Sequence, residues 1–265
     1  MRTMTSALPM TPARRGVLAI GVPIVLALIG FTGFNLVADI GQASYPVSYS
    51  IPVSAGHISL GTSGGDLTVR PSGTSTTGRL TGTVHYSLER PNLAVNKTAS
   101  GTDVSFQCRL TFGNCNLDAA LAIPASTALS LSSSGGNLSA SGITGDVSMS
   151  TGGGDVTVTG LPGLLRLNTS GGNINGNTLT SKIVSAGTGG GDVTLTFASV
   201  PQNVHITTSG GNINVVLPHG STRYNLHTST AGGNISDGTV PVDSLSPNVI
   251  TATTGGGDIT VTEAS

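Results

Sequence analysis

The chain has 265 residues, a formal net charge of −1, 39 glycines, no Trp and only 9% charged residues. A charge so close to zero removes the electrostatic argument for a nucleic-acid partner, and so few aromatic and charged side chains are atypical of a compact enzyme. Val, Ile, Leu and Thr nevertheless recur at regular places, so we expect a folded chain with a thin, elongated core rather than disorder.

An uncharged segment at residues 16–38 is long enough to cross a hydrocarbon core of roughly 30 Å. Arg14 and Arg15 precede it and Asp39 follows it, so the positive-inside rule places residues 1–15 in the cytoplasm. We therefore predict a transmembrane signal anchor in a single-pass protein of the cell membrane, with an extracytoplasmic C-terminal domain. The alternative is a signal peptide cleaved near Ala43, but the apolar segment exceeds the usual length of roughly 7–15 residues.

The part that follows the anchor divides into three by composition. Residues 39–52, with Gly, Ser and Pro, are predicted to be a linker. Residues 53–128 contain a first repeat unit and irregular strand-like segments, which we interpret as a β-rich N-terminal cap. Cys108 and Cys115 lie in this cap, and outside the membrane an isolated pair of cysteines is more often a disulfide than a metal or catalytic site.

A Gly-Gly-Asx element recurs along the rest of the chain, and residues 129–265 are predicted to be its repeats. From the third element on, the spacings between successive Asx residues are 18, 19, 20, 22 and 24. Residues eight before and one after each Asx are aliphatic, with period 2 on both sides of the turn, so each unit reads as two short strands joined at a glycine turn. The Asx residues are Asp66, Asn137, Asp155, Asn173, Asp192, Asn212, Asn234 and Asp258.

Two further positions of the repeat predict how stacked units are held together. The residue four before each Asx is always Thr or Ser, which by parity points inward and can satisfy backbone groups at the corner. No two neighbouring units from Asn137 to Asp258 both carry Asp. Stacked carboxylates about 4.8 Å apart would repel, so we interpret the alternation as relief of that repulsion.

The segment from Leu121 to Asp155 contains an Ile-Pro-Ala lead-in followed by Gly-Gly-Asx units, and it resembles the DUF4097 family of adhesin-like proteins. The resemblance covers residues 58–262. It implies a right-handed β-helix-like fold, frequently behind one membrane helix, with a role in adhesion or, in some relatives, in sensing envelope stress. It supplies no catalytic residues. The predicted fold class is thus an all-β solenoid with a β-rich N-terminal cap, preceded by one transmembrane helix.

The expected function is a non-catalytic adhesion, envelope-scaffold or sensing module, without a cofactor or metal, that contacts an unidentified surface protein or glycan. The alternatives are a calcium-dependent or a glycan-active β-helix protein. Calcium needs about six to eight oxygen ligands, and here Asn replaces half of the repeated carboxylates. An enzyme would gather singular acids on one face, whereas these acids are repeated turn residues.

One irregular cluster near the C-terminus is a candidate binding loop. The increasing repeat spacings imply longer loops opposite the glycine turns, and loops on a rigid scaffold commonly carry binding sites. The cluster consists of His219, Arg223, Tyr224 and His227. The simpler interpretation, a loosening of the C-terminal end of the array, remains open here.

Overall fold

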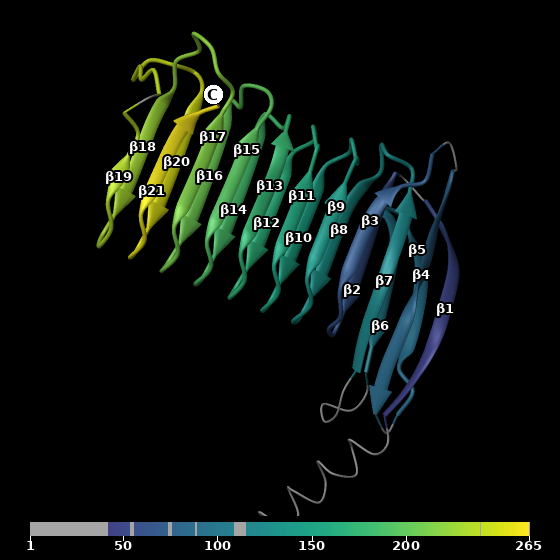
Figure 1. Cartoon of the computed structure of the whole chain (residues 1–265). Helices are drawn as coiled ribbons and strands as arrows, with labels where there is room; N and C mark the ends of the chain where they lie inside the picture. Colours follow the sequence, from purple (N-terminus) through teal and green to yellow (C-terminus); the bar gives the residue numbers. More distant parts are fainter. Residues whose placement is uncertain are drawn as a thin grey trace, which may run out of the picture.

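The structure is a computed structural model that describes residues 42–53, 56–73, 76–87, 89–108, 115–238 and 240–264. Within these residues the chain is all-β, as predicted. Its strands form two mixed sheets, and in each sheet the strands follow one another in a long row (Figure 1). In spatial order the first sheet contains β1 (Gln42–Pro52), β4 (Thr77–Ser87), β7 (Cys115–Ile123), β3 (Leu67–Pro71), β9 (Leu138–Ser141), β11 (Val156–Thr159), β13 (Ile174–Leu179), β15 (Val193–Phe197), β17 (Ile213–Leu217), β21 (Ile259–Glu263) and β19 (Ile235–Ser236). The second contains β18 (Asn225–Thr230), β20 (Val249–Thr254), β16 (Asn203–Thr208), β14 (Ile183–Thr188), β12 (Leu165–Thr169), β10 (Val147–Thr151), β8 (Ala128–Ser133), β2 (His57–Thr62), β6 (Gly101–Gln107) and β5 (Asn92–Thr98).

Each repeat unit is one coil of a solenoid, made of a strand in the second sheet, a glycine turn and a strand in the first sheet. In β14, for example, Val184, Ala186 and Thr188 are buried between the sheets while Ser185 faces solvent. Each strand pairs in parallel with the equivalent strand of the next coil, without a register shift between β10 and β12. Stacking therefore pairs the strand edges and buries the aliphatic row, which a single two-stranded unit cannot do alone.

The last two coils do not stack in the order of the sequence. The coil of β20 and β21 lies between that of β16 and β17 and that of β18 and β19, which ends the array. The chain passes over one coil position between β17 and β18, through residues 218–224, and returns between β19 and β20. The predicted long loops are these two connections: the first spans two coil heights instead of one, and the second returns by one coil height.

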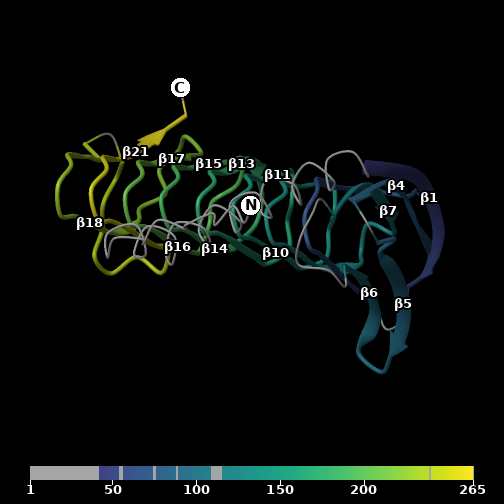
Figure 2. The same cartoon turned by 90° about the horizontal axis from the view of Figure 1, so that it is seen from below.

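The cap continues the same stack at the other end. β6 and β7 flank the first coil in parallel, β4 and β1 extend the first sheet in antiparallel order, and β5 pairs with β6. The β5 and β6 ribbon extends away from the stack (Figure 2).

The prediction of a linker at residues 39–52 is wrong for residues 42–52, the part that the structure describes. Residues 42–52 form β1, which is paired with β4 along its whole length. Val47 and Ile51 are buried in the core, and this burial outweighs the local signal of the prolines. Pro46 and Pro52 are tolerated because β1 is an edge strand whose outer N–H groups have no strand to bond.

The predicted cytoplasmic segment, residues 1–15, and the predicted anchor, residues 16–38, lie outside the described residues. Among the residues that are described, no helix is long and apolar enough to cross a membrane.

Candidate functional site

A ladder of Asx side chains runs along the glycine-turn corner and links successive coils. At each step the Oδ1 atom of one Asx accepts a hydrogen bond from the backbone N–H of the Asx in the next coil, at 2.7 to 2.9 Å. The repeated acids are therefore part of the scaffold. In spatial order the ladder contains Asp118, Asp66, Asn137, Asp155, Asn173, Asp192, Asn212, Asp258 and Asn234.

The predicted hydroxyl ladder lies just inside this corner. Thr188 is typical, because its buried Oγ1 donates to the carbonyl oxygen of Gly172 in the preceding coil at 2.8 Å and accepts from the N–H of Gly191 at 3.2 Å. Equivalent bonds to the preceding coil are made by Thr151, Thr169 and Thr208. The hydroxyls thus satisfy backbone groups that the tight turn would otherwise leave unpaired.

The glycine directly before each Asx of the repeats is required by close backbone packing. A Cβ atom at Gly154 would overlap the backbone of Gly136 in the adjacent coil, whereas one at Gly153 would have its nearest neighbour 4.0 Å away. The close approach of adjacent turns, which the Asx ladder needs, therefore depends on the last glycine of each turn.

Two carboxylates are adjacent only at the cap end of the ladder, where Asp66 follows Asp118. There the Nε2 atom of His85 lies 3.5 Å from Oδ2 of Asp118, and both side chains are about half exposed. A protonated His85 would offset the second negative charge. The Asp118 rung was missed from the sequence because no Gly-Gly pair precedes it.

A shallow hollow of about 540 Å³ opens beside this pair, where β1, β4 and β7 meet. Ser44, His85 and Asn116 occupy one cross-strand row at this place. This row lies in the cap, outside the repeats. Its three polar residues therefore differ from one another instead of following the repeat pattern. The hollow is lined by residues 42–44, His85, Tyr86, Asn116 and Asp118.

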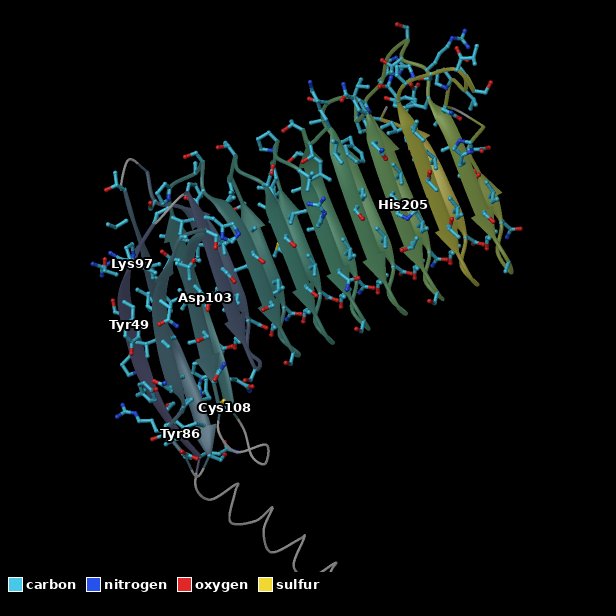
Figure 3. The ribbon with its side chains drawn as sticks, turned by 180° about the vertical axis from the view of Figure 1, so that it is seen from behind. Tyr49, Tyr86, Lys97, Asp103, Cys108 and His205 are labelled. Carbon is cyan, nitrogen blue, oxygen red and sulfur yellow. A yellow bond between two sulfur atoms is a disulfide. The ribbon has the colours of Figure 1, made fainter. Side chains whose placement is uncertain are left out.

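Aromatic contacts lie on the core-facing side of the same sheet, because Tyr45 and Tyr86 alternate with the exposed Ser44 and His85. Tyr86 packs edge-to-face against Tyr45, with ring centroids 5.8 Å apart, and the Arg90 guanidinium lies 4.0 Å from the centroid of the Tyr45 ring. Tyr86 and Cys108 lie at the same end of the cap (Figure 3). The hollow thus presents several hydrogen-bonding groups on a sheet whose other face is braced by these aromatic contacts, a composition suited to polar ligands.

The residues of the candidate binding loop predicted from the sequence do not form one surface, because one is buried and the others are exposed. Tyr224 is completely buried, so it cannot contact a partner. His219 and Arg223 are exposed in the loop before β18, and the carbonyl oxygen of Arg223 accepts from Ser246 Oγ at 2.7 Å. His227 faces solvent on β18, which is the edge strand of its sheet.

The buried Tyr224 has an unusual electrostatic environment. Burial, with a smaller contribution from the nearby carboxylate of Glu263, raises the pKa of Tyr224 above its ordinary value of 10.0. The Tyr224 hydroxyl and one Glu263 oxygen have no hydrogen-bond partner among the described residues, while the other oxygen lies 3.6 Å from His219 Nδ1. Tyr224 also bonds through its backbone to Pro241 and Asp243, so it lies in a packed junction between two loops.

The two cysteines form the predicted disulfide, with their Cα atoms 6.4 Å apart. The bridge joins the end of β6 to the start of β7, where the repeats have their glycine turn. In the part of the chain that the structure describes, no three His, Cys, Asp or Glu side chains are grouped closely enough to hold a metal ion.

Comparison with known proteins agrees with the resemblance drawn from the repeats. The profile of the family described as Toastrack DUF4097 matches residues 45–262. No curated protein matches the chain. A crystal structure of a candidate cell adhesion protein from Clostridium sporogenes is similar at 12% identity, covering 83% of this chain and 100% of that one, with a TM-score of 0.39. A likeness at that level does not extend to function.

Proposed function

Since this chain belongs to the Toastrack DUF4097 family, we propose that it is a non-catalytic adhesion module tethered to the cell membrane and exposed outside the cytoplasm. In this proposal residues 16–38 form the transmembrane anchor, and the solenoid has the right-handed winding that the family resemblance implies. The partner is a protein or a glycan at the surface of the cell or of a neighbouring cell.

The observation that supports this proposal most directly is the use of the repeated acids. Each accepts a backbone N–H from the adjacent coil, so these carboxylates hold the stack together instead of facing a substrate. No specific contact in the described residues favours the glycan-active or the calcium-dependent alternative.

The hollow beside His85 is the best candidate for the contact surface. Ser44, His85 and Asn116 project from three neighbouring strands of a rigid sheet, so their relative positions do not depend on a mobile loop. A row of polar side chains on a sheet is suited to the hydroxyl-rich surface of a glycan or to a polar peptide loop.

The first experiment tests topology and adhesion together in cells that express the full-length chain with a C-terminal epitope tag. External protease should remove the tag from intact cells, and the cells should adhere to a surface coated with envelope polysaccharide or envelope protein. A tag that is protected until lysis would contradict the extracytoplasmic placement. Normal adhesion without the chain, together with an altered envelope-stress response, would favour sensing.

A matched pair of variants tests the hollow itself. His85→Ala with Asn116→Ala should reduce adhesion at least about tenfold, as expected when buried polar contacts with a partner are lost. The control, His205→Ala with Asn168→Ala, removes the same residue types from the exposed face of the second sheet, where His205 is labelled in Figure 3, and should leave adhesion unchanged. Equal loss in both pairs, or in neither, would contradict the assignment of the hollow.

A further inference from the structure

The C-terminal end of the stack has an open edge whose backbone groups are unused. β18 is the last strand of its sheet and pairs on one side only, with β20 (Figure 1). The backbone N–H of Asn225 bonds toward β20, at the carbonyl oxygen of Asn248. Because alternate residues of a strand direct their peptide groups to opposite sides, those of Leu226, Thr228 and Thr230 point out of the stack.

The same end leaves the ladder incomplete. In the inner coils the Asx Oδ1 accepts the N–H of the next coil, but Asn234 is the last rung and its Oδ1 has no donor among the described residues. Apolar side chains are also exposed here, because Ile235 is 44% exposed and Leu245, in the loop that follows, is 91% exposed. The end therefore offers both backbone hydrogen bonds and apolar surface.

The opposite end is protected against such pairing. Its edge strand β1 contains Pro46 and Pro52, and β5 carries Lys97. Proline and lysine are the residues that natural sheets place on edges to prevent association. Residues 225–236 contain no Pro, Lys, Arg, Asp or Glu. The segment 225–236 at the C-terminal end therefore lacks these protective residues, and head-to-tail stacking of copies is disfavoured because the other end carries them.

We propose that β18 docks against β18 of a second copy of this chain, antiparallel about a two-fold axis at Thr228. The three outward peptide groups lie symmetrically around Thr228, so Leu226 of each copy is opposite Thr230 of the other and every outward group is matched. A contact without charged residues carries no like-charge repulsion, which a contact between identical surfaces otherwise suffers. Docking also covers Leu226 and Ile235 with their counterparts.

The free edge of β18 is short, which favours a second copy of this chain over a longer strand from another protein. Residues 241–243 already pair with Tyr224 on the outer side, through Pro241 and Asp243. A docked strand must therefore turn away after it passes Leu226. β18 itself ends at Thr230 and enters a glycine turn, so a second copy fits the space.

Cross-linking of the full-length chain in membranes of expressing cells tests the register. Thr228→Cys should give a covalent dimer on mild oxidation, because the Cα atoms of two such residues across the axis would be about 5.5 Å apart, within disulfide range. The control Ala252→Cys, in the same row one strand further in, should give none. Dimer from both variants, or from neither, would overturn the proposal.

Edge charges test the contact without adding a cysteine. His227→Lys with Ser229→Lys places like charges opposite each other across the axis, and should raise the dimer dissociation constant at least about tenfold. The control, His205→Lys with Thr207→Lys, places the same charges in the same rows of the inner strand β16 and should leave the dimer intact. Light scattering of the detergent-extracted full-length chain and its melting temperature give the readout. A monomeric wild type, or equal loss in both variants, would overturn the proposal, even if the chain still supports adhesion.

Discussion

The Oδ1 atom of Asn212 accepts a 2.9 Å hydrogen bond from the backbone N–H of Asp258, although 46 positions separate the two residues in the sequence. Asp258 in turn accepts from the N–H of Asn234 at 2.7 Å. Along the sequence two Asn units are adjacent at 212 and 234, but in space Asp258 lies between them. From Asp66 to the end of the ladder, Asp and Asn therefore alternate strictly in space.

The spatial order leads to a prediction that the sequence order does not make. Asn212→Asp places a third carboxylate between Asp192 and Asp258, so the free energy of unfolding should fall by about 2 kcal/mol near neutral pH, at about 1 kcal/mol for each new pair. Asn234→Asp adds one such pair at an exposed end and should cost about half as much. Denaturant unfolding measures both, and added salt should reduce the difference from wild type. Equal stability of the two variants would contradict the assigned order.

The glycine turns predict a sharp contrast between neighbouring positions. Gly154→Ala should destabilise the fold by more than about 3 kcal/mol, because the new methyl group would overlap the backbone of Gly136 in the adjacent coil. Gly153→Ala is the control, since its methyl group would have its nearest neighbour 4.0 Å away, and should change stability by less than about 1 kcal/mol. Thermal melting of the two variants checks this. A tolerated Gly154→Ala would mean that the coils are not in van der Waals contact at the turn.

The pKa of Tyr224 predicts a loss of stability at alkaline pH. In the unfolded chain a tyrosine loses its proton near pH 10, whereas burial keeps Tyr224 protonated to higher pH in the folded chain. The unfolded state then binds fewer protons, so the contribution of Tyr224 is complete below about pH 10 and is lost as the pH rises above it.

Tyr224→Phe should remove that part of the alkaline loss and leave stability at pH 7 equal or higher, because the hydroxyl has no partner among the described residues. Unfolding measured from about pH 7 to 11 checks this. Tyr49→Phe, on the exposed edge strand β1, is the control and should keep the wild-type profile. A steeper alkaline loss in Tyr224→Phe would contradict the prediction.

We predict that the disulfide between Cys108 and Cys115 stabilises the cap. Cys108→Ser with Cys115→Ser should lower the free energy of unfolding by about 2–3 kcal/mol, since the bridge closes a short loop and restricts the unfolded chain. Alkylation of the unfolded, unreduced full-length chain should find no free thiol. Two reactive thiols in exported protein would show that the bridge does not form there.

Local pattern was enough to predict the repeated parts of this molecule. Val184, Ala186 and Thr188 alternate with polar residues, so strand, buried face and inward hydroxyl follow from period 2 alone. The disulfide was predictable because only two cysteines exist. The hollow beside His85 was not, since its residues come from strands whose order in the cap no local pattern determines.

The sequence by itself determined the coil, because alternation, the inward Thr and the Gly-Asx turn each act over a few residues. Only the tertiary structure decided which coil lies next to which. All coils present nearly the same aliphatic row, so that row cannot select a neighbour, and loop length and the chemistry of the edges decide instead. The insertion of Asp258 beside Asn212, the recruitment of Asp118 as a rung and the burial of Tyr224 all follow from contacts between residues far apart in the chain.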